Sequence, residues 1–233
     1  MSEENRIIEY YRYRDSEQGV DKAFFSYRSL ADLLMHQERV RNTLQLLRKY
    51  NMTSHSIGGM KILDVGCGSG GILREYIQWG ATPENLAGID LSADRVHLAK
   101  RLAPHLDIRC ASATHIPYED QTFDLVMQHV VFTSILQDDM LFTIAQQMVR
   151  VLKPTGMILW YDYFYDNPFN SNVRAVKKDK IKQLFPDLKL DLSRITLAPP
   201  IARNIPKLVL PVVYPILSSF PFLCTHYLGV LHF

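Results

Sequence analysis

A glycine-rich turn offers the first chemistry in this sequence. The stretch ILDVGCGSGG runs from Ile62 to Gly71, and Gly66, Gly68 and Gly71 have the spacing G-x-G-x-x-G. Glycines between a strand and a helix let the backbone come close to a ligand. Asp90 follows about 20 residues later, where a carboxylate can hold ribose hydroxyls. The turn therefore predicts either a dinucleotide bound by its pyrophosphate or S-adenosylmethionine bound by its amino-acid end.

The charge of Asp64 separates these two ligands. Asp64 stands two residues before the first glycine, so we expect its carboxylate near the charged group of the ligand. A pyrophosphate would be repelled there, whereas the ammonium and sulfonium of S-adenosylmethionine would be attracted. The sequence therefore favours S-adenosylmethionine. The alternative for Asp64 and Asp90 is a structural role as acids that cap turns.

Further polar residues follow two later apolar runs. Methyl transfer from a sulfonium is an in-line displacement, which mainly requires alignment and exclusion of water. A hydroxyl acceptor also benefits from a general base, and histidine is the usual choice. His129 ends one of these runs, at the end of a strand where ligands bind in open α/β sheets, and is the first candidate for the base. A role in packing is an equally weighted alternative for His129. Asp162 and Tyr163 end the next run and are candidates to orient a polar acceptor or to accept its proton.

Short apolar runs alternate with amphipathic stretches from Lys61 onward, and these predict the elements that position the site. Strands are expected over 61–66, 85–91, 107–113, 123–130 and 156–163, and helices over 70–80, 92–104 and 140–154. Strands that alternate with helices of this length favour right-handed crossovers and a parallel sheet. The predicted fold class is a doubly wound α/β fold.

The two ends of the chain differ from this pattern. Residues 1–57 are expected to form an N-terminal helical cap or lid, with leucines and Val40 at three- and four-residue intervals from Leu30 to Leu47. Residues 58–233 would form the core, with a lysine-rich helix over 173–184 and strands over 192–199 and 225–233. A proline-rich apolar insertion, about residues 198–223, precedes the last strand.

The insertion contains an uncharged stretch from Leu208 to Thr225, which approaches the roughly 20 apolar residues of a membrane span. Pro211, Pro215 and Pro221 interrupt it and would remove backbone hydrogen bonds. We therefore expect no transmembrane span, and instead a buried helical cap or a wall of the substrate pocket.

Composition narrows the class of protein. The chain has 233 residues, 47% of them hydrophobic, and a net charge of +2. The small charge argues against a nucleic-acid partner. The cysteines, Cys67, Cys110 and Cys224, are widely spaced, which favours a reducing setting and predicts no metal site. The N-terminus lacks the pattern of a secretory signal, so a cytoplasmic location is expected.

Four motifs follow one another across about residues 60–165: ILDVGCGSG, GIDLS, ASATHIPYEDQTFDLVMQ and VRVLKPTGMILWYDY. In this order they resemble the motifs of class I S-adenosylmethionine-dependent methyltransferases. The resemblance implies a seven-stranded Rossmann-like sheet whose last strand is antiparallel, with the tail strands around Ser193 and Tyr227 closing it.

The resemblance also implies roles for individual residues. Asp64, Gly66, Cys67 and Gly68 would line the methionine end, Asp90 would accept from both ribose hydroxyls, and Leu91 would pack on the adenine. Ser112 and Ala113 occupy a turn where the family often has an acidic residue; a backbone amide or His115 would replace it here. Gln128 would lie beside the methyl group, and Tyr11, in an N-terminal lid, could close over the sulfonium by a cation–π contact.

The function implied is transfer of a methyl group to an oxygen or nitrogen of a small molecule. The segments NPFNSNVRAV, ITLAPPIAR and FLCTHYLGVL are similar to a bacterial subgroup associated with glycan and secondary-metabolite genes, which suggests a sugar, a glycolipid or a natural product. The apolar stretch from Leu208 to Leu223 would suit an acceptor with a lipid portion or a hydrophobic ring. Thr133 and Ser134 stand where many relatives carry a histidine pair, so the better-known members are an incomplete guide.

Three alternatives remain open. A nucleic-acid or protein methyltransferase would share the fold, although the first usually has an acid or asparagine and two prolines where this chain reads QHVV. A nicotinamide-dependent oxidoreductase would use the same glycines for a pyrophosphate. A module that binds the cofactor without catalysis is the third.

Overall fold

The computed structural model describes residues 2–18, 29–167 and 170–233. Its strands are β1 (Ile62–Val65), β2 (Leu86–Asp90), β3 (Asp107–Cys110), β4 (Phe123–His129), β5 (Leu152–Tyr163), β6 (Lys189–Leu197) and β7 (Cys224–His232). They form one seven-stranded sheet in the order β3-β2-β1-β4-β5-β7-β6. The strands from β3 to β5 are parallel, and β7 runs antiparallel to β5 and β6. The predicted doubly wound sheet with an antiparallel last strand is confirmed.

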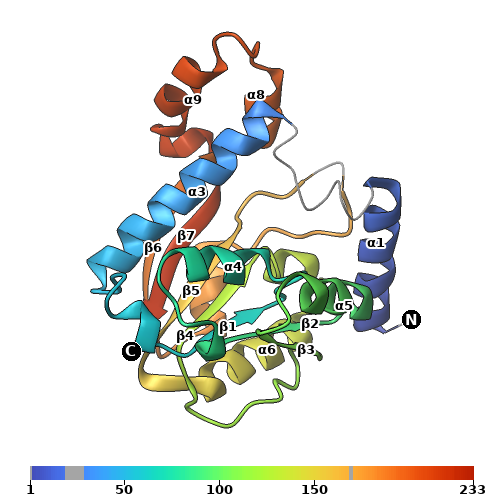
Figure 1. Ribbon diagram of the computed structural model, residues 1–233. Helices are drawn as coiled ribbons and strands as arrows, with labels where there is room; N and C mark the ends of the chain where they lie inside the picture. Colours follow the sequence, from blue (N-terminus) through green and yellow to red (C-terminus); the bar gives the residue numbers. More distant parts are fainter. Residues whose placement is uncertain (1, 19–28, 168–169) are drawn as a thin grey trace.

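Helices cover both faces of the sheet (Figure 1). They are α1 (Glu3–Gln18), α3 (Leu30–Lys49), α4 (Gly71–Gln78), α5 (Ala93–Leu102), α6 (Asp138–Val151) and α7 (Lys178–Leu184). Short 3₁₀ turns are η2 (Ile57–Gly59), η3 (Pro83–Asn85) and η4 (Phe132–Ser134). The neighbours Ile62 and Leu63 of β1 enter different hydrophobic clusters, because successive side chains of a strand point to opposite faces. Buried residues of α4 and α5 belong to the cluster that contains Ile62, and buried residues of α6 and α7 belong to the cluster that contains Leu63.

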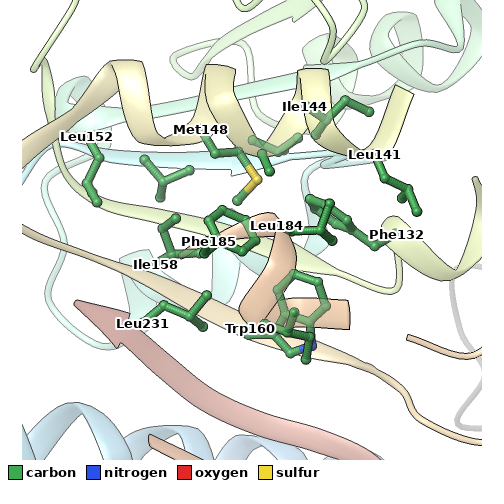
Figure 2. Packing of buried hydrophobic residues seen from close by; sticks show 14 of the residues in the cluster. Phe132, Leu141, Ile144, Met148, Leu152, Ile158, Trp160, Leu184, Phe185 and Leu231 are labelled. Carbon is green, nitrogen blue, oxygen red and sulfur yellow. The ribbon is translucent and has the colours of Figure 1, made fainter. Parts of the chain in front are cut away.

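The larger cluster lies between the sheet, α6 and α7 (Figure 2). The rings of Phe132 and Trp160 have centroids 4.8 Å apart, and Phe185 lies 6.1 Å from each. Met148 and Ile144 reach the same cluster from α6. This packing holds the η4 turn, which follows β4, against β5, and so fixes the backbone at the carboxyl end of β4.

In the described part of the expected N-terminal cap, α1 and α3 pack in different places; residues 19–28 lie outside the described residues. Ile7 of α1 packs into the cluster shared with α6. α3 packs on β6 and β7. Its buried face differs from the predicted apolar one: Glu38 and Arg39 are buried along with Leu47. Leu33 and Leu44 are only half-buried. The apolar spacing of α3 therefore does not identify its most buried side.

The helix predicted over 173–184 begins only at Lys178. The backbone amides of Arg174 and Val176 donate to the carbonyl oxygens of Thr133 and Tyr163 instead. These tertiary hydrogen bonds hold the segment against η4 and the end of β5 in a non-helical conformation.

The insertion before the last strand forms α8 (Pro199–Asn204), α9 (Leu210–Ser218) and η5 (Pro221–Leu223), which pack against the N-terminal part of α3. Among the described residues, no helix is both long enough and apolar enough to cross a membrane. The segment also differs from the expected buried cap, because several of its large apolar side chains are exposed.

Candidate functional site

A cavity of about 220 Å³ opens at the carboxyl ends of the central strands. It is lined by α1, the glycine turn, the end of β2, the turn after β3 and the segment from β4 to α6. The sequence-predicted residues that line it are Tyr11, Gly66, Asp90, Leu91, Ser112, Ala113 and His129. Those outside its lining are Asp64, Cys67, Gly68, Gln128, Asp162 and Tyr163. The fold therefore brings one half of the expected site together around a single space.

The glycine turn comes very close to the segment after β4. Gly66 has φ +75°, and a Cβ at this position would lie 2.5 Å from Cγ2 of Val131. Only glycine combines this backbone conformation with such an approach. Cys67 turns its side chain into the core, against Gly88, so only its backbone faces the turn.

The backbone amides of this turn are already used. Gly66 and Cys67 both donate to the carbonyl oxygen of Ile89, at 2.8 and 2.9 Å, and Gly68 donates to Oδ2 of Asp90 at 2.8 Å. A pyrophosphate at a strand-to-helix turn is held by free N–H groups. The turn has few free donors, so its chemistry does not suit a diphosphate.

Asp64 is a buried acid with no hydrogen-bond partner. It is 1% exposed in β1, and both of its carboxylate oxygens lack a partner among the described residues. Burial, and then the nearby charge of Asp90, raise the pKa of Asp64 well above its ordinary value, and Arg39 opposes them. An orphaned carboxylate next to the glycine turn is chemically suited to a cationic group of a ligand.

Asp90 ends β2 and lines the cavity. Its Oδ1 accepts from the amide of Ser92 and its Oδ2 from that of Gly68, each at 2.8 Å. These bonds orient the carboxylate, and each oxygen keeps a second lone pair for a ligand hydroxyl. Burial raises the pKa of Asp90, against the effect of these amides and of Arg95.

The turn after β3 contains an acidic group that comes from elsewhere in the chain. Oε1 of Glu4, in α1, accepts from the hydroxyl of Ser112 at 2.5 Å and lies 3.4 Å from Oγ1 of Thr114. His115, the expected substitute for the missing acid, is exposed and outside the cavity lining. Sequence reasoning missed Glu4 because it lies 108 residues from Ser112.

α1 closes one side of the cavity through Tyr11. The hydroxyl of Tyr11 lies 2.7 Å from Oγ of Ser134, and the guanidinium carbons of Arg14 and Arg95 each lie 4.4 Å from its ring centroid. Arg95 also forms two hydrogen bonds with Asp15, both 2.8 Å long. In this arrangement the ring of Tyr11 is in contact with protein cations. Arg14 and Arg95, which line the cavity, were not identified from the sequence, because surface arginines are common on helices.

The end of β4 combines a strained backbone with an unpaired histidine. Val130 has φ +58°, which is rare for a β-branched residue, and Gln128 supports the turn by accepting from the amide of Val131 at 3.0 Å. His129 lines the cavity, and neither of its ring nitrogens has a hydrogen-bond partner among the described residues. Burial, and then the charge of Arg39, lower the pKa of His129 well below its ordinary value. His129 is therefore neutral at neutral pH, with a lone pair on one ring nitrogen, and its surroundings disfavour the protonated form.

Asp162 and Tyr163 end β5 behind this turn. Asp162 is fully buried, and its carboxylate accepts from the hydroxyl and amide of Thr133 and from the amide of Tyr163. Burial raises its pKa to about 7. The ring of Tyr163 lies 3.8 Å from that of His226, centroid to centroid. Both residues thus hold the η4 turn and the end of β5 from outside the cavity.

Arg39 of α3 is a further buried cation near this site. Its Nη2 donates to both carboxylate oxygens of Glu75, at 2.8 and 2.9 Å, whereas its Nη1 is buried without a partner among the described residues. Its charge influences both Asp64 and His129. Nothing in a leucine- and arginine-rich helix distinguishes it, so the sequence did not indicate it. The described residues contain no cluster suited to a metal ion.

Comparisons with known proteins agree with this geometry. The family described as "Methyltransferase domain" matches residues 62–156. Phthiotriol/phenolphthiotriol dimycocerosates methyltransferase 1 of Mycobacterium ulcerans is 32% identical over 112 residues, which are 47% of this chain and 40% of that protein. Sterol 24-C-methyltransferase of Aspergillus fumigatus is 28% identical over 144 residues, 55% of this chain and 37% of that protein. The chain thus spans less than half the length of these relatives, and the fungal match gives no support to a bacterial subgroup.

A solved structure shares the fold over almost the whole chain. The magnesium protoporphyrin IX methyltransferase of Synechocystis PCC 6803, determined with bound S-adenosylmethionine, aligns with a TM-score of 0.65 at 13% identity, covering 100% of this chain and 98% of that one. This likeness shows that the chain has the fold of that methyltransferase, and residues 62–156 within this fold match the methyltransferase-domain family.

Proposed function

We propose that the chain transfers the methyl group of S-adenosylmethionine to an oxygen or nitrogen of a small molecule with a hydrophobic or lipid portion. The observation that carries the proposal is the buried, unpartnered carboxylate of Asp64 beside the glycine turn. When bound, the sulfonium of S-adenosylmethionine supplies a methyl group that is open to in-line displacement.

The residues at the glycine turn fit the amino-acid end of this cofactor. Asp64 would pair with the ammonium, and the buried Nη1 of Arg39 is a cation suited to the carboxylate. A Cβ at Gly68 would meet nothing within 4 Å, so Gly68 leaves room for the ligand, whereas Gly66 is packed against Val131.

The opposite end of the cavity fits adenosine. Asp90 would accept from the ribose hydroxyls with its remaining lone pairs, and Leu91 would pack on the base. Ser112 and Ala113 line the cavity, and Glu4 of α1, which accepts from Ser112 next to this lining, would be an acceptor for the adenine amine.

The acceptor would approach the methyl group beside His129. The neutral imidazole would accept the proton of the attacking group, and Gln128 would hold the turn that carries it. We assign Asp162 and Tyr163 to positioning, because they brace η4 and β5. Tyr11 would close the cavity from α1.

The apolar lining supports an acceptor with a hydrophobic portion. Ile7, Ile135, Met140 and Ile144 line the cavity between α1 and α6, and apolar walls of this kind bury the non-reacting part of a ligand. The two curated relatives are named as methyltransferases of phthiotriol/phenolphthiotriol dimycocerosates and of a sterol, the second at carbon. We propose an acceptor with an apolar portion for this chain as well, methylated at oxygen or nitrogen.

The first test is calorimetric titration with S-adenosylhomocysteine, with NADH as the parallel ligand. We expect binding of S-adenosylhomocysteine alone, followed by transfer of labelled methyl groups to hydroxylated acceptors with an apolar chain or ring. Binding of NADH alone would refute the proposal.

His129→Ala tests the proton acceptor. We expect at least a tenfold loss of turnover with unchanged affinity for S-adenosylhomocysteine, and no effect of the control His105→Ala, whose histidine is exposed. Because the pKa of His129 is lowered, the acidic limb of kcat/KM should lie below 6.5, the ordinary value for histidine. Unchanged turnover in His129→Ala would remove this residue from the reaction.

A further inference from the structure

The insertion before the last strand forms a separate helical lobe, made of α8, α9 and η5 (residues 199–223). In Figure 1 it stands out from the sheet at the top, beyond the N-terminal end of α3. None of its residues lines the cavity described above. The role of the lobe is therefore a question apart from methyl transfer.

The lobe is firmly attached by its inner side. Leu210 and Tyr214, one helical turn apart in α9, are buried against Ala31 of α3 and Ala202 of α8. The hydroxyl of Tyr214 also donates to Oε2 of Glu38 at 2.5 Å. The inner face of α9 thus has a defined place in the fold, which orients its outer face toward solvent.

The outer face of the lobe is apolar as well. The exposed large side chains and their exposed fractions are Leu208 91%, Val212 68%, Phe222 68%, Ile216 56%, Val209 43%, Phe220 43% and Ile201 37%. Val212 and Ile216 lie one turn apart on α9, on the side away from Tyr214. A helix at the surface of a globular protein normally presents polar residues there, and a contiguous exposed apolar patch marks an interaction site.

The charges of the lobe point to the kind of partner. The sequence contains no Asp or Glu from Leu192 to Phe233. Arg203 pairs with Asp32 at 2.8 Å, whereas Lys207 is exposed directly beside Leu208. Exposed apolar side chains next to a cation, with acidic residues absent, are complementary to an anionic lipid surface.

We propose that the helical lobe docks on the surface of an anionic lipid bilayer. Leu208, Val212, Ile216 and Phe222 enter the boundary between headgroups and acyl chains, and Lys207 meets the lipid phosphates. α9 has nine residues, far fewer than the roughly 20 needed for a span, so it lies on the membrane and does not cross it. This inference does not rest on the proposed methyl transfer.

The test is co-sedimentation of the purified full chain with vesicles of phosphatidylcholine alone or mixed with phosphatidylglycerol. We expect binding that increases with the anionic lipid. A variant with Leu208→Ser, Val212→Ser and Phe222→Ser should lose at least tenfold in partition coefficient. Lys207→Glu should weaken binding to anionic vesicles and leave binding to neutral vesicles unchanged. The control Leu102→Ser, which changes an equally apolar side chain, 50% exposed, in α5, should bind like the original protein.

Three results would overturn the proposal. The first is absence of binding by the unaltered chain. The second is equal binding by the triple variant. The third is a dimer, measured by light scattering, that the triple substitution converts to a monomer, because a second copy would then cover the patch. The substituted side chains are largely exposed, so thermal denaturation should show a stability close to that of the original protein.

Discussion

Asp64→Asn should raise the stability of the protein and lower its affinity for the cofactor. The carboxylate is 1% exposed, and neither oxygen has a hydrogen-bond partner among the described residues. An unsatisfied buried charged group costs about 1–3 kcal/mol or more. An asparagine amide would also lack partners there, but it carries no charge and has no proton to lose. Asp64→Asn should therefore raise the free energy of unfolding of the ligand-free protein by about 1–3 kcal/mol at about pH 8, through the part of the penalty that comes from deprotonation.

The pH dependence of this gain has a definite sign. Burial raises the pKa of Asp64 in the folded state, so the folded protein retains a proton that the unfolded chain releases. The folded state is therefore penalised as pH rises, and each unit of pH between the unfolded and folded pKa values corresponds to about 1.4 kcal/mol. The advantage of Asp64→Asn should be greatest at about pH 8 and should shrink at about pH 5. Urea denaturation at the two pH values measures it.

The affinity should change in the opposite direction. Removing one partner of a buried charge pair costs about 2–5 kcal/mol, so the Kd for S-adenosylhomocysteine should rise roughly 30-fold or more. Calorimetry measures this change, and S-adenosylhomocysteine is suitable because it retains the ammonium group. The matched control is Asp187→Asn, at an exposed turn between α7 and β6, which should alter neither quantity. Affinity equal to that of the original protein, or a loss of stability, would refute the pairing of Asp64 with the ammonium.

Two further substitutions test the backbone and the core behind the site. Gly66→Ala places a Cβ 2.5 Å from Val131 at φ +75°, so it should lower the free energy of unfolding by about 1–3 kcal/mol and weaken cofactor binding. The control Gly59→Ala, where a Cβ meets nothing within 4 Å, should be nearly neutral. Equal effects of the two substitutions in urea denaturation would contradict the close approach of Gly66 to Val131. Burial lowers the pKa of His226 to about 3, so the unfolded chain takes up a proton below 6.5 that the folded state excludes, and stability should decline as pH falls. His226→Phe should reduce the loss of unfolding free energy between about pH 7.5 and pH 5 by up to about 2 kcal/mol. If the urea midpoints of the variant and of the original protein fall in parallel over this range, His226 is not the group responsible for the decline.

The parts of the fold that were predicted correctly depend on short-range patterns. β1, β2 and β4 are buried along most of their length and lie between turns or amphipathic helices, so each gives a clear apolar run in the sequence. Asp64 and Asp90 were located for the same reason, because both belong to buried strands next to the glycine turn. Parallel pairing then brings their ends to one edge.

The features that were missed depend on contacts between distant parts of the chain. Arg39 reaches Glu75 across 36 residues, and Glu4 reaches Ser112 across 108. Neither has a local pattern that distinguishes it from a solvated surface residue. The late start of α7 also involves distant contacts, since the carbonyl oxygens of Thr133 and Tyr163 accept from the amides of Arg174 and Val176, which lie before the helix.

The attachment of α1 bears on how a ligand enters the cavity. Its buried side chains are only Glu3 and Ile7 among the described residues, and Tyr11 packs partly buried against the same cluster as Ile7. Polar contacts add to this attachment, as in the bonds from Arg6 to the carbonyl oxygen of Ser134 and from Arg95 to Asp15. Elements held by few buried apolar contacts separate from a fold at a lower free-energy cost than core elements. Because α1 contributes Ile7, Tyr11 and Arg14 to the cavity lining, its separation would open that side of the cavity. The lid role expected for this helix from the sequence stays a prediction, and this weak attachment is compatible with it.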